Sequence, residues 1–245
     1  MKKNILQIMT AVVFSIGTLS TFGQAEIQII HNAADPSATI VDVYVNGNLA
    51  LDNFAFRTAT PFIPLPSGTL LNIGVAPGNS MSVNDTLKNF QATLMMGQRY
   101  IAVANGVLNP GSFAVNPDGK STAFTLFIQD NIQNIAMNAG YVDFIVVHGS
   151  SDAPTVDVIA RNVATLVNDA AYGDITPYIS VPPASYTLDV TPAVGSPIVA
   201  SFTADLSGLG GGSAVVFASG FLNPSINQNG PAFGLFAALA NGTVV

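Results

Sequence analysis

The chain is 245 residues long, with 49% hydrophobic residues, only 9% charged residues and a formal net charge of −7. Its 7 Lys and Arg residues are too few to form a basic patch, which argues against nucleic acids and anionic membrane surfaces as partners. The sequence has no Cys, which excludes disulfides, thiolate metal sites and a cysteine nucleophile. Its 22 Gly and 15 Pro residues predict many short strands joined by tight turns.

The first 25 residues have the pattern of a secretory signal peptide. Lys2 and Lys3 form a positive start, residues 5–22 form an apolar run, and cleavage is expected after one of two small residues, Gly23 or Ala25. The run is short and contains polar residues, so we expect it to be removed rather than kept as an anchor. We therefore predict a chain that is secreted, periplasmic or on the cell surface, with no stable membrane insertion after leader removal.

The strand pattern begins at residues 26–31, where apolar and polar residues alternate and His31 is the last residue before a turn. Residues 41–45 alternate in the same way and end at Asn46-Gly47, a dipeptide typical of a hairpin. Three prolines interrupt the next segment, which predicts an edge strand or a crossing between sheets: Pro61, Pro64 and Pro66. Further strands are predicted at residues 71–75, 100–104 and 124–128. Six or seven short strands with Pro and Gly corners predict a β-sandwich.

The second half of the chain repeats the first. The segment with His148, Asp152 and Val156-Asp157-Val158 matches the one with His31, Asp35 and Val41-Asp42-Val43. The matched blocks stay in step while the gaps between them vary, as expected for repeated strands joined by variable loops. We therefore predict an all-β chain with two tandem immunoglobulin-like β-sandwiches. The predicted boundaries are a signal peptide at 1–25, repeat 1 at 26–130, a linker at 131–140 and repeat 2 at 141–245.

These blocks resemble the bacterial domain-of-unknown-function family 4397. The family pattern is a strand ending in His, an Asp-Ala-Pro-like turn, a Val-Asp-Val-Tyr strand with an Asn/Asp-Gly turn, and then Ala-Thr-Pro-Tyr and Leu-Pro-Ala-Gly. Repeat 1 departs from it by an Ala-Asp-Pro order and two extra residues before Val41, and repeat 2 has Arg161-Asn162 in place of the Asn-Gly turn. The matching residues are His148, Asp152, Ala153, Pro154, Val156, Asp157 and Val158 in repeat 2, and His31, Asp35, Pro36, Val41, Asp42, Val43, Tyr44, Asn46, Gly47, Thr60, Pro61, Phe62, Leu65, Pro66 and Gly68 in repeat 1. The resemblance implies secreted or surface β-sandwich modules, often in tandem, in a Bacteroidota-type secreted protein, and it assigns no functional residues.

The recurrent ionisable residues are the candidate site residues: His31, Asp35, Asp42, His148, Asp152 and Asp157. One interpretation is a metal site with one imidazole and two carboxylates in each repeat. The other is structural, with a strand-end imidazole that bonds backbone groups in the turn closed by Asp35 or Asp152. We favour the structural interpretation because the spacing is loose and Asp42 falls on the face opposite the neighbouring valines.

No catalytic motif accompanies these residues. The sequence has no Gly-x-Ser-x-Gly elbow, and the glycine-rich segment 208–213 lacks the lysine of a phosphate-binding loop. We therefore expect a chain that is not an enzyme and needs no cofactor. The predicted function is a secreted or cell-surface repeat module that acts as a spacer or binds an extracellular protein partner in adhesion. The alternative is a module that binds a glycan or a metal ion through the duplicated His/Asp turn.

Overall fold

The computed structural model describes residues 23–245, so the predicted signal peptide lies outside the described residues except for its last three positions. Within this range the regular structure is almost entirely β-strand, and the only helical elements are four short 3₁₀ turns. These turns are η1 (Pro36–Ala38), η2 (Val83–Asp85), η3 (Pro110–Ser112) and η4 (Pro224–Ile226). The prediction of an all-β fold is confirmed.

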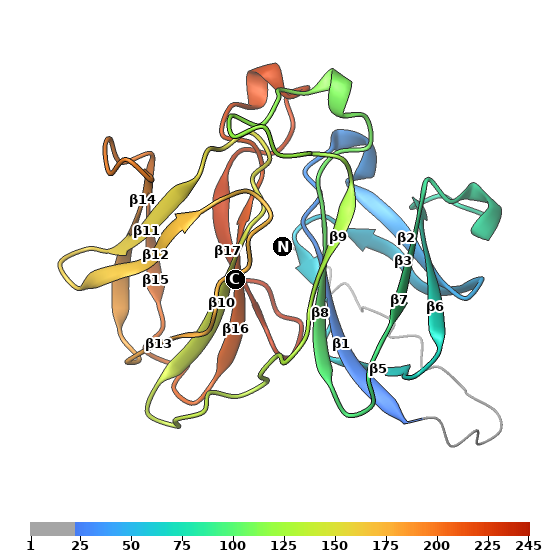
Figure 1. The fold of residues 1–245 in the computed structure, drawn as a ribbon, viewed down its shortest axis with the longest axis horizontal. Coiled ribbons are helices and arrows are strands. Elements are labelled where there is room, and N and C mark those ends of the chain that lie inside the picture. Colours follow the sequence, from blue (N-terminus) through green and yellow to red (C-terminus); the bar gives the residue numbers. More distant parts are fainter. Residues whose placement is uncertain (1–22) are drawn as a thin grey trace, which may run out of the picture.

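Unit 1, formed by strands β1 to β9, is a sandwich of two sheets (Figure 1). Its inner sheet has the order β4-β1-β8-β9, with β5 also paired to β1, and contains β1 (Gln24–His31), β4 (Thr58–Ala59), β5 (Ile63–Pro66), β8 (Arg99–Asn105) and β9 (Thr125–Gln129). Its outer sheet has the order β3-β2-β6-β7 and contains β2 (Ile40–Val45), β3 (Asn48–Ala55), β6 (Leu70–Pro77) and β7 (Lys88–Thr93). The pair β1 and β8 is parallel, and every other pair in the unit is antiparallel.

Unit 2, formed by strands β10 to β17, repeats this arrangement. Its inner sheet has the order β13-β10-β16-β17 and contains β10 (Val142–His148), β13 (Ile179–Val181), β16 (Ser213–Ser219) and β17 (Gly234–Leu239). Its outer sheet has the order β12-β11-β14-β15 and contains β11 (Val156–Ala160), β12 (Ala164–Ala170), β14 (Ser185–Pro192) and β15 (Ala200–Asp205). Again one pair, β10 and β16, is parallel. The predicted pair of β-sandwiches is confirmed, and the assignment to the immunoglobulin-like class stays a prediction.

The two inner sheets pack against each other, so the molecule has four layers with the inner sheets side by side in the middle (Figure 1). The inner strands are apolar on both faces: in β8, Ile101 faces the other unit whereas Tyr100 and Ala102 face the core of unit 1. A strand that is buried on both faces has a nearly continuous run of apolar residues in its sequence. This is the case for β10, in which all seven residues are buried.

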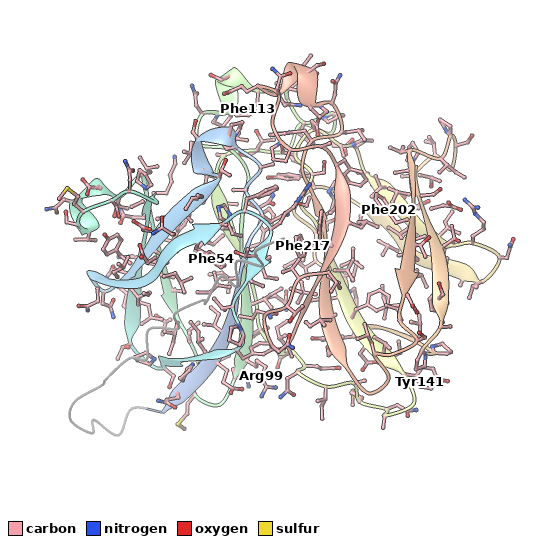
Figure 2. All side chains as sticks on the ribbon, turned by 180° about the vertical axis from the view of Figure 1, so that it is seen from behind. Phe54, Arg99, Phe113, Tyr141, Phe202 and Phe217 are labelled. Atoms are coloured by element: carbon pink, nitrogen blue, oxygen red, sulfur yellow. The ribbon has the colours of Figure 1, made fainter. Side chains whose placement is uncertain are left out.

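The residues between the inner sheets form a core of their own. This inter-unit core consists of Ile30, Ala59, Ile101, Val103, Ile132, Ile145, Val147, Val215, Phe217 and Ala238. Phe217 lies near the middle of the molecule, whereas Phe54 and Phe202 lie within the two separate sandwiches (Figure 2). Burial of a side chain of this size contributes roughly 1.5–3 kcal/mol, so the contact strongly favours the packed arrangement of the units.

The segment predicted as a linker, residues 131–140, is packed onto both units. Ile132 belongs to the inter-unit core, and its N–H donates to the carbonyl of Arg99 at 3.1 Å. Further along, the N–H of Ala136 donates to the carbonyl of Gly211 at 2.9 Å. These contacts hold the connection between the sandwiches in a defined path.

Candidate functional site

His31 is the last residue of β1 and closes the turn that follows it. Its Nε2 lies 2.7 Å from the carbonyl oxygen of Ala38, and its Nδ1 lies 3.4 Å from the N–H of Ala33. The ring is fully buried and stacks on Phe54 with 5.9 Å between ring centroids. Burial lowers the pKa of His31 from 6.5 to about 4, so the imidazole is neutral at pH 7. A neutral ring with Nε2–H donating and Nδ1 accepting satisfies both nitrogens.

His148 occupies the equivalent position at the end of β10 but has only one of these bonds. Its Nε2 lies 3.0 Å from the carbonyl oxygen of Pro154, and its Nδ1 has no hydrogen-bond partner among the described residues. Burial lowers the pKa of His148, and the Pro154 carbonyl partly offsets this effect. The ring meets Tyr172 edge-on at 6.3 Å, as His31 meets Phe56 at 6.1 Å.

Asp35 and Asp152 connect the first turn of each unit to a distant loop. Asp35 caps η1 by accepting a hydrogen bond from the N–H of Ser37, and it accepts another from the N–H of Leu108, both at 2.8 Å. Asp152 accepts from three donors at 2.7–2.8 Å: the N–H groups of Leu222 and Asn223 and the side-chain amide of Asn227. Each carboxylate therefore joins the strand-end turn to the loop that follows the parallel partner strand.

Asp42 and Asp157 hold a β-bulge in the outer sheet of each unit. Asp42 accepts from the N–H of Asn53 at 2.8 Å, and Asp157 accepts from the N–H of Asp169 at 2.7 Å. Asn53 and Asp169 have φ values of 53° and 54°, at the register shifts where β3 and β12 bulge. Ser80 donates a second hydrogen bond to Asp42 at 2.5 Å.

The six candidate side chains are thus brought into two equivalent sets, but they do not converge on a common point. Within residues 23–245 no group of three or more His, Asp or Glu side chains is arranged to hold a metal ion. Each carboxylate instead bonds a different backbone segment, which agrees with the structural interpretation of the duplicated motif.

Sequence reasoning did not find the polar contacts between the units. Arg57 lies over the rings of Phe56 and Phe236, with its guanidinium carbon 4.8 and 4.2 Å from the centroids. It donates to the hydroxyl of Ser219 at 3.0 Å and to the carbonyl of Ala232 at 2.6 Å. Burial lowers its pKa. The sequence points to Arg57 only as one of few basic residues, and this does not indicate which groups its side chain contacts.

The same region of unit 2 contacts unit 1 through Tyr172, the counterpart of Phe56, because the position equivalent to Arg57 is Gly173. The hydroxyl of Tyr172 accepts from the amide of Asn105 at 2.9 Å, and burial raises its pKa to about 12. Asn32 donates to Asn105 at 2.8 Å and to the carbonyl of Ala218 at 3.0 Å. A side chain at Gly149 would collide with the Asn32 amide, so a glycine is needed where the units meet.

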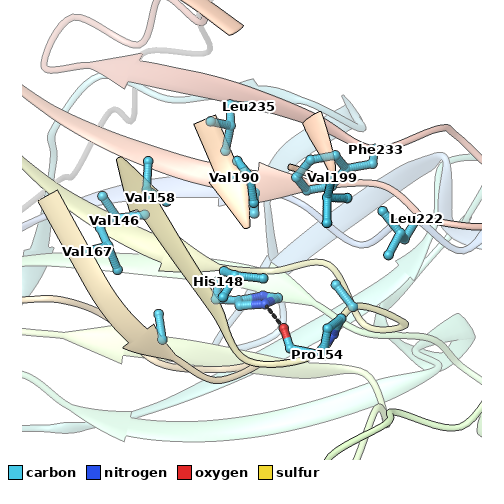
Figure 3. A pocket seen from close by; sticks show the side chains of 14 residues that line it. Val146, His148, Pro154, Val158, Val167, Val190, Val199, Leu222, Phe233 and Leu235 are labelled. Carbon is cyan, nitrogen blue, oxygen red and sulfur yellow. Dashed lines mark hydrogen bonds between the residues drawn. The ribbon is translucent and has the colours of Figure 1, made fainter. Parts of the chain in front are cut away.

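The structure contains a small cavity and a wider groove. A cavity of about 30 Å³ lies beside His148 between the sheets of unit 2 (Figure 3). A wider groove of about 330 Å³ runs beside the glycine-rich segment 208–213 and is lined by polar but uncharged side chains and by apolar ones. Its polar side chains are Asn134, Ser213 and Asn241, and its large apolar ones are Val142, Leu209 and Leu239.

The sequence signature described as "Domain of unknown function (DUF4397)" matches residues 25–158 and again residues 141–226. No curated protein sequence matches the chain. Within residues 23–245 no helix is long and apolar enough to cross a membrane.

Some solved structures have a partial likeness to the chain. One, described as "Alpha-glucan binding by a streptococcal virulence factor", has 7% identity and a TM-score of 0.24, and the match covers 78% of this chain and 92% of the other. Another, "The fimbrial anchor protein Mfa2 from Porphyromonas gingivalis", has 11% identity and a TM-score of 0.21, with 91% and 99% covered. At these scores the likenesses carry no argument about function.

Proposed function

Because the chain belongs to the DUF4397 family, whose description assigns no function, we propose from its structure that it is a non-catalytic scaffold of the cell exterior. In this role the chain holds two sandwiches as one rigid block and presents their outer sheets and end loops to a protein partner. The observation that carries the proposal is the inter-unit core. Domains joined by a chain move relative to each other unless their contact is large and apolar, and this one is apolar and centred on Phe217.

The polar contacts around the core support the same function. Gln28 donates to the carbonyl of Leu239 at 2.7 Å, and Arg57 reaches two groups of unit 2 from the other end of the inner sheet. Buried hydrogen bonds of this kind have a strict geometry, so they define one relative orientation of the units. A spacer or adhesion module needs such a fixed shape, whereas a flexible tether does not.

The roles of the candidate residues also favour a structural over a catalytic use. A catalytic acid, base or nucleophile must reach a substrate. The imidazole of His31 and the carboxylates of Asp35 and Asp42 are buried and bonded to the chain itself. Their duplication is then a requirement of the fold of each unit.

Calorimetry of the mature chain tests the scaffold. We expect one unfolding transition whose calorimetric and van't Hoff enthalpies agree, because the units share a core. The variant Phe217→Ala, which opens that core, should separate the transition into two. Phe202→Ala, within unit 2, leaves the core intact and should lower the melting temperature of the single transition without dividing it. Two separate transitions in the wild type would contradict a single rigid block.

Two further measurements test the location and the absence of catalysis. Cells that produce the full chain should hold it outside the cytoplasm, and a chain without residues 1–22 should remain inside. The purified chain should show no turnover on ester, glycoside or peptide substrates. Turnover that survives purification and is lost in His148→Gln would overturn the non-catalytic assignment.

A second candidate function is supported by the groove beside residues 208–213. Its lining combines amide groups, a hydroxyl group and an apolar floor without an ionisable side chain, which suits a neutral glycan better than a charged ligand. If this function holds, a glycan array should give hits that Asn134→Ala and Asn241→Ala weaken, with His31→Gln as an unchanged control. An array without hits would eliminate it.

A further inference from the structure

The inner sheets of the two units end at equivalent edge strands, β9 in unit 1 and β17 in unit 2 (Figure 1). Ala102 and Val216 are equivalent, because each pairs with the residue two positions before the duplicated histidine. Ala102 pairs with Ile128 of β9, and Val216 pairs with Ala237 of β17. Ile128 is therefore the counterpart of Ala237, and the edge of one unit is a direct reference for the edge of the other.

In unit 2 the outer side of this edge is covered by the chain itself. The N–H of Ala237 donates to the carbonyl of Val245 at 2.8 Å, and the N–H of Val245 donates back to the carbonyl of Ala237 at 3.0 Å. The N–H of Leu239 donates to the carbonyl of Thr243 at 2.8 Å. Residues 243–245 thus form a short antiparallel strand on the outer side of β17.

In unit 1 the matching backbone groups face outward without a covering strand. Because Ala237 uses its N–H and C=O on the outer side, those of Ile128 point outward too, and so do those of Leu126 two residues earlier. Within residues 23–245 these four groups have no hydrogen-bond partner. The chain does not fold back over β9, since the segment 131–140 crosses to unit 2, where the N–H of Ala136 donates to a carbonyl.

β9 also lacks the features that protect the other sheet edges. Proline, bulges, charged residues, short length and covering segments all keep an edge strand from pairing with another chain. β5 contains Pro64 and Pro66, β4 and β13 have two and three residues, β3 and β12 are bulged, β17 is covered by residues 243–245, and β7 and β15 contain Lys88 and Asp205. The sequence of β9 is TLFIQ, which has no charge and no proline, and its pairing with β8 has no bulge.

We propose that β9 is the interface of a homodimer in which the β9 strands of two copies pair antiparallel, edge to edge. The outward N–H and C=O groups of Leu126 and Ile128 have the same spacing in both copies, so an antiparallel copy satisfies them reciprocally about a two-fold axis. The pairing joins the two inner sheets that contain β9 into one continuous sheet.

Two observations favour a second copy as the occupant of this edge. Among the described strands β9 is the edge without a protecting feature, so it is also the strand that a second copy has available. The chain has a formal net charge of −7, so two copies repel each other, and an uncharged strand is where they can approach closely. The side chain of Ile128, which is 39% exposed, would be covered in the pair. This interface does not depend on the scaffold proposal, since it lies at the edge of one inner sheet and not between the units.

Sedimentation equilibrium and amide hydrogen exchange of the mature chain test the proposal. The mass should rise from that of one copy towards that of two with a dissociation constant on the order of 100 µM, because a strand pair buries a small area. Exchange of the N–H groups of Leu126 and Ile128, followed by NMR, should slow about tenfold between dilute and concentrated samples. The N–H of Phe127 bonds β8 in each copy, so it should be protected at every concentration and serves as the internal reference.

Two variants at Ile128 separate edge pairing from other association. Ile128→Pro removes an outward N–H that β8 does not use, and Ile128→Lys keeps the backbone groups but places two positive charges close together in the dimer. Both should be monomeric at concentrations at which the wild type is dimeric. Met81→Lys makes the same change of charge at a position that is 95% exposed and should leave the dimer intact. If Ile128→Pro does not fold, Ile128→Lys alone still decides, because it removes no backbone hydrogen bond.

Three outcomes would overturn the proposal. The first is a chain that stays monomeric up to about 1 mM, as it would if β9 served only a strand from another protein. The second is a dimer that persists in Ile128→Lys. The third is a dimer in which the exchange of the Leu126 and Ile128 amides is the same as in the monomer.

Discussion

Units 1 and 2 place a histidine at the same strand end and bond its Nε2 to the carbonyl of the same turn, yet they surround it differently. His31 is stacked on Phe54 and has partners on both nitrogens, whereas His148 borders a cavity and its Nδ1 has no partner within residues 23–245. The shared bond belongs to the fold of the unit. The difference teaches that the same fold and the same histidine bond persist when the packing around the ring is looser in one unit than in the other.

The largest effect is expected from removal of the Phe54 ring, which unit 2 replaces with Ala170. Phe54→Ala should lower the free energy of unfolding by about 3–5 kcal/mol, because it deletes a buried aromatic ring and leaves a cavity. Urea denaturation followed by fluorescence or circular dichroism measures this loss, and Met81→Ala, at a position that is 95% exposed, is the unchanged control. A loss below about 1 kcal/mol would mean that unit 1 accepts the open packing of unit 2 at little cost.

The next prediction concerns how the stability contributed by the buried histidines depends on pH. The pKa of His31 falls on folding from 6.5 to about 4, so the unfolded chain binds the proton more readily than the folded one. Stability from this group is therefore complete above pH 6.5 and is lost as the pH falls towards 4. Since one pKa unit corresponds to about 1.4 kcal/mol, the loss is about 3 kcal/mol.

The variant His31→Gln keeps a donor for the Ala38 carbonyl but does not titrate, so its stability should fall less between pH 7 and pH 4. His148→Gln is the matched variant in unit 2, where the pKa is lowered by the same cause. Urea denaturation at a series of pH values gives both slopes. If neither variant flattens the pH dependence, the histidines do not account for it.

The bulge carboxylates should show a smaller difference between the units. Asp42 is buried and accepts from both Asn53 and Ser80. Asp157 is partly exposed, and within residues 23–245 its side chain accepts from Asp169 alone. Asp42→Ala should therefore cost about 2 kcal/mol and Asp157→Ala about 1 kcal/mol. Asp52→Ala, at an exposed neighbour, is the control, and equal losses in the two units would contradict this order.

The smallest expected effect tests the metal interpretation of the duplicated residues. Addition of Zn²⁺ or Ca²⁺ to the wild type should leave the melting temperature unchanged within about 1 °C, since a bound ion would raise it. His31→Ala and His148→Ala should each lower it, because each removes a bond between a strand end and its turn. Stabilisation by either ion that is lost in both variants would restore the metal site.

Several parts of the fold could be read from local patterns. The Asn46-Gly47 dipeptide does join two hairpin strands, β2 and β3. The proline-rich segment does form an edge strand, since β1 is the one strand among the described residues with which β5 pairs. Both predictions succeed because turn chemistry and the missing N–H of proline act within a few residues.

The candidate site was predictable only in part. The repetition of the His and Asp residues identified positions that each unit needs for its fold. It could not identify the partners of the carboxylates, which lie far along the chain: Asp35 accepts from Leu108, and Asp152 accepts from Asn227. The same holds for the cavity, because the absence of a ring at Ala170 acquires meaning only when the strand register aligns it with Phe54.

Local sequence patterns were enough to predict an all-β chain, its duplication and the position of both histidines at strand ends, because alternation and turn residues are properties of neighbouring positions. The tertiary structure alone decided that the inner sheets face each other and that Arg57 and Asn32 reach across to unit 2. It also decided that Nδ1 of His31 accepts a hydrogen bond, whereas Nδ1 of His148 has no partner in the described part of the chain. The physical reason is that burial and hydrogen-bond satisfaction depend on which distant segments come together, and an apolar run such as β10 shows that a strand is covered without showing by what.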